Sequence, residues 1–201
     1  MVHADVVVYN VDLASISNSK FTAYIIPDIK YQPPYDLCSL VNSLKFDRKF
    51  ASGRFTKLFG DLPYTYGNVS HKTSKLSDNE FVLDMFNFVT AILPRFQVNS
   101  CLINYYPDSK SSIPDHSDDE IEIDDNSFIV TLSLGSDRTM HFKCKHDKTL
   151  ISTVTLSHGM VLIFSKSSQT IFTHGIPPNY CISSIDDYIP RVSATFRKLI
   201  S

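Results

Sequence analysis

The sequence predicts an α+β, mainly β fold: a double-stranded β-helix (jelly roll) with N-terminal helices packed on one sheet. Two observations lead to this prediction. Ahead of Pro94, two segments place apolar residues at helical spacing. After Pro94, seven short segments rich in Ile, Val, Phe, Thr and Tyr are separated by Gly, Asp, Asn, Ser or Pro, which is typical of strands and turns. Among all-β closures, a jelly roll with helices on one sheet fits this order best.

The two predicted helices cover residues 36–46 and 77–94. The second begins with Ser77 and Glu80 as a Ser-x-x-Glu capping box and ends at Pro94. Each helix has apolar residues recurring every three or four positions, so each is expected to cover the core with one stripe. The predicted stripes are Leu37, Leu40, Val41 and Leu44 in the first helix and Phe81, Met85, Phe88 and Ile92 in the second.

The predicted strands fill the C-terminal half of the chain. Residues 127–134 alternate most clearly, with Phe128, Val130, Leu132 and Leu134 on one face. No repeat, linker or low-complexity segment divides the chain, so one domain over residues 1–201 is expected. The seven predicted strands are 99–106, 127–134, 138–144, 150–156, 159–165, 169–174 and 190–198.

The composition is that of an ordinary globular protein, with 43% hydrophobic residues and a net charge of −2 over 201 residues. This balance argues against a strongly cationic, salt-driven nucleic-acid binder, because phosphate contacts need Lys and Arg. Basic residues nevertheless concentrate in residues 45–57, and acidic residues in residues 115–125. The alternative for each segment is an ordinary solvated loop.

The cysteines and the N-terminus bear on the cellular setting. Cys38, Cys101, Cys144 and Cys181 are scattered without a Cys-x-x-Cys pair, which argues against a zinc knuckle and a disulfide framework. No stretch approaches the roughly 18 apolar residues of a membrane helix, and the N-terminus lacks a secretory signal pattern. We therefore expect a cytoplasmic protein in a reducing setting, with no membrane partner.

A possible metal site begins at His116-x-Asp118. On a strand, residues two apart point to the same face, so this imidazole and this carboxylate could bind one cation together. His174 ends an apolar strand far enough along the chain for that strand to return beside the pair. Two His and one carboxylate form the facial triad of non-haem Fe(II) oxygenases. The alternative for His174 is a histidine that caps a strand before a proline turn.

The segment from Arg191 to Arg197 alternates in the same way as a strand. Val192, Ala194 and Phe196 fall on one face, and the other face carries two arginines. Buried guanidinium groups are costly unless they meet anions, and an arginine fork suits a carboxylate. The two arginines lie about 20 Å apart at ~3.3 Å per residue, so they cannot easily share one carboxylate.

These motifs together resemble a known family. The stretches NYYPDSKSSIPDHSDDE, THGIPP and RVSATFRKL resemble, in order and at closely similar spacing, the AlkB family of Fe(II)- and 2-oxoglutarate-dependent dioxygenases. The upstream stretch GRFTKLFGDLPYTYG is similar to that family's nucleotide-recognition segment. The resemblance covers roughly residues 50–198. It implies a nucleotide-recognition lid and supporting helices in about residues 1–95 and a jelly-roll core in about residues 96–201.

The resemblance also implies roles for individual residues. His116, Asp118 and His174 would hold Fe(II), and Arg191 would bind the distal carboxylate of 2-oxoglutarate. Four further cosubstrate positions are matched: Asn104, Tyr106, Ser193 and Arg197, where Ser193 stands at a place that many members fill with Asn. Four substrate positions are expected: Glu120 against the target base, Tyr64 and Tyr66 for stacking, and Arg54 for a phosphate. The alternatives are core aromatic residues for the tyrosines and a solvated side chain for Arg54.

The implied reaction is oxidative N-demethylation of nucleic acid. O2 and 2-oxoglutarate would give succinate and carbon dioxide, and the hydroxylated methyl group would leave as formaldehyde. The expected substrates are N1-methyladenine and N3-methylcytosine in methylated RNA or single-stranded DNA, with RNA slightly favoured. Two alternatives stay open: an N6-methyladenine RNA demethylase, and a 2-oxoglutarate dioxygenase acting on protein or a small molecule.

One subgroup resembles this chain in particular, the AlkB-type domains within replication polyproteins of some plant RNA viruses. This similarity is the reason for favouring RNA. It implies a domain that belongs to a larger viral polyprotein in the host cytoplasm. We expect the domain itself to be monomeric.

Overall fold

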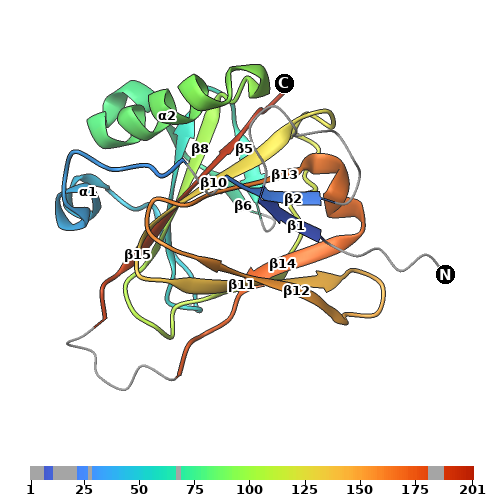
Figure 1. Ribbon diagram of the computed structural model, residues 1–201. Coiled ribbons are helices and arrows are strands. Elements are labelled where there is room, and N and C mark those ends of the chain that lie inside the picture. Colours follow the sequence, from blue (N-terminus) through green and yellow to red (C-terminus); the bar gives the residue numbers. More distant parts are fainter. Residues whose placement is uncertain (1–6, 11–21, 27–28, 67–68, 181–187) are drawn as a thin grey trace.

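The computed structural model describes residues 7–10, 22–26, 29–66, 69–180 and 188–201, and it consists of two facing sheets with two helices on the outside (Figure 1). The larger sheet has the strand order β1-β2-β13-β10-β15-β8-β4-β3, with β7 also paired to β4. The smaller sheet has the order β12-β11-β14-β9, and β5 and β6 form a separate pair. This arrangement confirms the predicted jelly roll with helices on one sheet.

Most strands of the larger sheet are antiparallel. Only β1–β2 and β4–β7 pair in parallel among the described strands. The strands of this sheet are β1 Val7–Asn10, β2 Thr22–Ile25, β3 Arg48–Lys49, β4 Phe55–Gly60, β7 Thr73–Ser74, β8 Ser100–Tyr106, β10 Phe128–Gly135, β13 Val161–Ser165 and β15 Arg191–Arg197. The remaining strands are β5 Tyr64–Tyr66, β6 Val69–His71, β9 Ile113–His116, β11 Arg138–Cys144, β12 Leu150–Leu156 and β14 Phe172–Ile176.

The helices α1 (Leu37–Ser43) and α2 (Glu80–Ile92) cover the outer face of the larger sheet (Figure 1). The predicted capping box is wrong: α2 begins one residue after Asn79, whose side-chain oxygen accepts the Val82 N–H at 3.0 Å. Ser77 instead belongs to a short 3-10 turn, η1 (Leu76–Asp78). A second such turn, η2 (Pro94–Phe96), follows α2.

The buried face of α2 is rotated relative to the predicted stripe. Its fully buried residues are Val82, Met85 and Val89. Phe81 and Phe88 are only partly buried, because their rings pack sideways against Tyr35 and Tyr31 at centroid distances of 4.5 and 4.9 Å. Compact valines thus let the helix approach the sheet, and the larger rings flank it. Ile92 is also partly buried.

The larger sheet separates two apolar cores. The first fills the space under the helices and takes Val192, Ala194 and Phe196 from β15. The second lies on the other face of this sheet and includes Leu102, Phe142 and Phe172. Because side chains alternate along a strand, the polar positions of β15 face the second core, between the sheets. The two arginines therefore point into the molecule, as the alternation predicted.

Six of the seven predicted strands agree with the structure to within two residues at each end. The segment 169–174 differs, because residues Lys166–Thr170 form a 3-10 turn, η3, ahead of β14. The Ser165 side chain accepts the Ser168 N–H at 3.3 Å and caps this turn. Serine side chains that bond to nearby backbone groups compete with strand pairing. Cys181 lies outside the described residues.

Candidate metal centre

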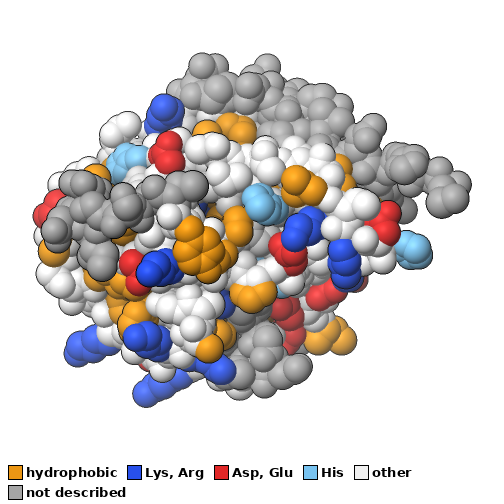
Figure 2. Space-filling model, turned by 90° about the horizontal axis from the view of Figure 1, so that it is seen from below, with side chains coloured by type: hydrophobic (Ala, Val, Ile, Leu, Met, Phe, Trp, Pro, Cys, Tyr) orange, Lys and Arg blue, Asp and Glu red, His pale blue; other side chains and the backbone are white. Residues whose placement is uncertain are grey.

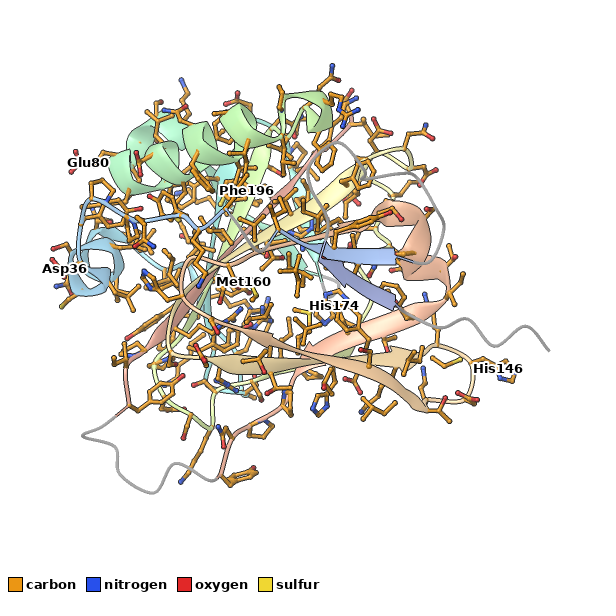
Figure 3. All side chains as sticks on the ribbon, viewed as in Figure 1. Asp36, Glu80, His146, Met160, His174 and Phe196 are labelled. Carbon is orange, nitrogen blue, oxygen red and sulfur yellow. The ribbon has the colours of Figure 1, made fainter. Side chains whose placement is uncertain are left out.

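Three side chains meet between the two sheets. His116 and His174 are register partners on β9 and β14, with ring centroids 4.3 Å apart. The ligand atoms of His116, Asp118 and His174 all lie within 4.8 Å of one another. Figure 3 places His174 in the space between the sheets. The structure therefore brings together the three residues that the sequence predicted as a metal site.

The spacing of His116 and Asp118 predicts that both lie on one strand, but in the structure they do not. His116 is the last residue of β9, and Asp118 lies two residues further on, in the loop that follows. The His116 Nδ1 atom is 2.9 Å from the Pro114 carbonyl oxygen. A proton on Nδ1 that donates to this carbonyl leaves Nε2 for a metal, and Nε2 is the atom that lies 3.7 Å from Asp118 Oδ1.

The electrostatics keep all three groups in their metal-binding protonation states near neutral pH. Burial, together with the neighbouring His116, lowers the pKa of His174 to about 3. The pKa of His116 is also lowered, chiefly by burial. Burial would raise the pKa of Asp118, but Arg197 and the two histidines lower it to about 2. Neutral imidazoles and an ionised carboxylate are the forms that bind a cation.

Arg197 is paired within this centre. Its Nη2 atom donates to Asp118 Oδ2 at 2.7 Å, and both side chains are almost completely buried. Burial alone would lower the pKa of Arg197, yet the Asp118 carboxylate reverses the effect and the pKa is raised. The other carboxylate oxygen, Oδ1, has no hydrogen-bond partner among the described residues. It is therefore available to a metal ion.

A pocket extends from the metal ligands along the inner face of the larger sheet. Arg191 lies in its wall, 1% exposed, and its Nε donates to Ser133 Oγ at 3.0 Å. Burial lowers the pKa of Arg191, and the Tyr106 phenol beside it partly offsets this. Within the described part of the chain, its Nη1 and Nη2 atoms have no hydrogen-bond partner. All five predicted cosubstrate residues line this pocket: Asn104, Tyr106, Arg191, Ser193 and Arg197.

Arg54 also lines the pocket, which differs from its predicted place. We expected an exposed side chain that could meet a phosphate, but Arg54 is 2% exposed. It donates a hydrogen bond to Asn104 Oδ1, and its guanidinium carbon lies 4.2 Å from the centroid of the Phe50 ring. The turn between β3 and β4 directs the side chain inward, where it fixes the Asn104 amide. An exposed nucleic-acid backbone does not reach this position.

Two of the predicted substrate residues, Tyr64 and Glu120, lie beside the metal ligands. The Tyr64 hydroxyl is next to the Glu120 carboxylate, and the Arg197 guanidinium lies 5.4 Å from the Tyr64 ring centroid. Burial and the Asp118 charge raise the pKa of Glu120 to about 7. Tyr64 is only 1% exposed, so its ring belongs to the second apolar core and offers no exposed stacking surface. Tyr66 belongs to β5, but its side chain lies outside what the structure describes.

Arg138 was not predicted, although the sequence carried a signal. It occupies a buried position of β11 and donates to the carbonyl oxygens of Ser111 and Pro177 at 2.8 and 2.7 Å. Its guanidinium carbon lies 5.6 Å from the Tyr106 ring centroid. A charged residue in phase with the buried positions Met140 and Phe142 indicates a residue with buried partners.

The donor set fits a divalent metal together with a small dianion. Two imidazoles and one carboxylate suit non-haem iron, and Asp118 Oδ1 and His174 Nδ1 lack hydrogen-bond partners among the residues described. The buried fork of Arg191, with both amino groups open, matches a carboxylate. Buried polar atoms are normally satisfied, so this grouping indicates places for ligands.

Comparison with known proteins agrees with this chemistry. A profile of the 2OG-Fe(II) oxygenase superfamily matches residues 41–197. The chain belongs to this superfamily. Its cofactors are Fe(II), 2-oxoglutarate and O2, and His116, Asp118 and His174 could hold the iron.

Curated relatives confirm the AlkB branch that the motifs predicted. The mouse "Alpha-ketoglutarate-dependent dioxygenase alkB homolog 3" is 30% identical over 165 residues, which cover 77% of this chain and 54% of the relative. Its human counterpart is 28% identical over 169 residues, with the same coverage. The bovine "DNA oxidative demethylase ALKBH2" is 27% identical over 186 residues, which cover 88% of this chain and 64% of the relative. The chain spans about half the length of the first two relatives.

Proposed function

We propose that this protein is an oxidative demethylase that removes N-methyl groups from nucleic acid. The observation that carries the proposal is the buried fork of Arg191, open to a carboxylate, in the same pocket as the iron ligands. The names of the relatives support the substrate class, since one of them is a "DNA oxidative demethylase". No helix among the described residues is long and apolar enough to span a membrane.

The pocket residues would hold 2-oxoglutarate in one orientation. Arg191 would bind its distal carboxylate with both amino groups, because a planar fork forms two parallel bonds with a carboxylate. Asn104 and Tyr106 point from β8 into the same pocket, where an amide and a phenol can donate hydrogen bonds to an anion. Ser193 pairs in register with Asn104 and would contribute a hydroxyl group to the pocket wall, from a side chain smaller than asparagine. Arg197 would keep the Asp118 carboxylate ionised beside the metal.

Iron with 2-oxoglutarate and O2 supplies the oxidising power that converts a methyl C–H bond into C–OH. The protein residues determine what reaches it. The core around His174 includes Phe142 and Phe164, with ring centroids 6.3 and 5.0 Å from the imidazole, and it excludes bulk water from this side. After hydroxylation the N–CH2OH group would release formaldehyde, and the ring nitrogen would then lose its proton to give the unmodified base.

The methylated base would enter beside Glu120. This carboxyl group lies two residues past Asp118 and next to the Tyr64 hydroxyl, so it can meet the polar edge of a base presented to the metal. A base reaches such a pocket only when it is flipped out or single-stranded. We propose N1-methyladenine and N3-methylcytosine as the substrates, with RNA slightly favoured over DNA.

A panel of oligonucleotides tests the proposal. Single- and double-stranded RNA and DNA that carry N1-methyladenine, N3-methylcytosine or N6-methyladenine would be incubated with Fe(II), 2-oxoglutarate and O2 and analysed by mass spectrometry. The expected result is a loss of 14 Da from the first two marks, the mass of CH2, fastest in single-stranded RNA. Succinate formation without demethylation of any oligonucleotide contradicts the proposal and favours a protein or small-molecule substrate. Selective demethylation of N6-methyladenine would show that the proposed substrate bases are wrong.

A further inference from the structure

Gln169 is a buried residue for which the iron site so far assigns no role. It lies in η3, the orange turn between β13 and β14 (Figure 1), and it is completely buried. Its Oε1 atom accepts the backbone N–H of Asp118 at 3.1 Å. Its Nε2 atom donates to Ser168 Oγ at 3.1 Å, so both ends of the amide are bonded. Nothing in the sequence indicates this contact, because the two residues are far apart in the chain.

We propose that Gln169 is a positioning residue that fixes the metal ligand Asp118. The loop after β9 has no strand partner at Asp118, so its buried N–H would be left unsatisfied without the Gln169 oxygen. Arg197 holds the carboxylate of the same residue through Oδ2. With the backbone held by Gln169 and the carboxylate held by Arg197, Oδ1 stays 3.7 Å from His116 Nε2.

The position of Gln169 in the chain strengthens this role. Gln169 lies three residues before the start of β14, the strand that carries His174. One continuous segment therefore supplies one metal ligand and holds a second ligand from a different segment. Metal affinity depends on the spacing of ligands, and residues that orient ligands affect it strongly.

Two lysines attach the same loop around this contact. Lys145 donates to Asp119 at 2.6 Å and to the Gln169 carbonyl oxygen at 3.3 Å, and Lys166 donates to the Glu120 carbonyl oxygen. The outer face seen in Figure 2 carries oppositely charged side chains next to one another. Exposed ion pairs contribute little individually. The Gln169 bond differs from these contacts because it holds the backbone of the metal ligand itself.

Metal binding by the full chain tests the inference. Metal-free protein would be titrated with Mn(II) alone, by calorimetry, for the wild type and for Gln169→Met, which keeps a similar volume and removes the acceptor. The dissociation constant should rise roughly 10- to 100-fold, the usual effect of losing a residue that orients a ligand. The matched control is Thr170→Val, which removes a hydroxyl bond to the Ser167 carbonyl from the same turn and should stay within about twofold.

A second measurement separates positioning from mere stabilisation. At saturating metal, the 2-oxoglutarate concentration for half-maximal succinate formation should be unchanged in Gln169→Met, because Gln169 does not line the pocket with Arg191. Unchanged Mn(II) affinity in folded Gln169→Met, or equal weakening in Thr170→Val, overturns the inference. If Gln169→Met does not fold, Ser168→Ala decides, since it removes the group that orients the Gln169 amide. Unchanged affinity in that variant also overturns it.

The inference deepens the proposed function and rests on its iron site, but not on its substrate. If the wild-type protein bound no Mn(II), the assignment of the iron site itself would be wrong. If the protein bound Mn(II) normally but demethylated no oligonucleotide, only the proposed substrate would be wrong. The metal titration therefore distinguishes the failure of the positioning role from the failure of the proposed function.

Discussion

The two ends of β15 present the same side chain in opposite situations. Arg197 is bonded to Asp118 at 2.7 Å, a pair buried inside the protein. Arg191 is buried as deeply, but its two amino groups have no hydrogen-bond partner in the described part of the structure. A buried charge that is paired supports the fold, whereas one left unpaired lowers stability until a ligand arrives. The difference distinguishes the part of the strand that builds the site from the part that receives the cosubstrate.

The largest effect is expected for Asp118→Ala. This change removes a metal ligand and leaves Arg197 without its anion, so succinate formation should be abolished. Breaking a buried ion pair costs about 3–5 kcal/mol, and urea unfolding should show a loss of this order. Asp119→Ala, the matched control, removes an exposed carboxylate paired with Lys145 and should retain turnover. Full succinate formation by Asp118→Ala would contradict the metal assignment.

Arg197→Met should destabilise the metal-free protein by about 3 kcal/mol, because Asp118 is then buried without a counter-charge. Saturating Mn(II) should recover part of this loss, since the cation replaces the guanidinium as partner. The control is Lys198→Met, the next residue along the chain, whose partly exposed pair with Asp124 is worth about 0–1 kcal/mol. Urea unfolding with and without metal checks both variants. Equal stabilities of the two variants would contradict the comparison.

Arg191→Met should behave in the opposite way. Without 2-oxoglutarate its free energy of unfolding should fall by no more than about 1 kcal/mol, because an unpaired buried charge is removed. The 2-oxoglutarate concentration for half-maximal turnover should rise roughly 100-fold, from the loss of charge-assisted bonds worth about 3 kcal/mol. The 2-oxoglutarate requirement of Arg191→Lys should lie between those of the wild type and Arg191→Met, since lysine keeps the charge without the planar fork.

Thermal unfolding offers an independent check of Arg191. At a concentration of about 100 times its dissociation constant, 2-oxoglutarate should stabilise the metal-loaded wild type by about 2.7 kcal/mol. Arg191→Met should gain almost nothing at the same concentration. A normal gain in Arg191→Met would show that the distal carboxylate has another partner.

The sequence predicted those parts of the molecule that depend on local alternation. The strands of the C-terminal half and the inward face of Arg191 and Arg197 follow from a period of two, which local residues determine. The strands β3 and β7 were missed because two residues show no period. The packing of Tyr64 and Arg54 was also missed, because their burial depends on partners in distant segments. Gln169 differs again, since an amide is suited equally to the surface and to a buried bond.

The smallest effect is expected for Ser193→Ala. Ser193 faces the pocket between the two arginines and pairs with Asn104 and Ser133 on the neighbouring strands. Its hydroxyl can contribute at most one neutral hydrogen bond to a ligand, worth about 1 kcal/mol. The 2-oxoglutarate requirement should therefore rise by less than about tenfold. A larger rise would make Ser193 a principal cosubstrate contact.

The central place of β15 has a consequence for the motions of the site. β15 lies between β10 and β8 and is bonded to both over most of its length, whereas β5 and β6 pair, among the described strands, only with each other. Amide protons of β15 should therefore exchange with solvent only when the whole domain unfolds, while those of the β5–β6 ribbon exchange through local opening. The strand that carries Arg191 would thus stay formed for as long as the domain is folded, whereas the ribbon that carries Tyr64 beside Glu120 would open and close many times.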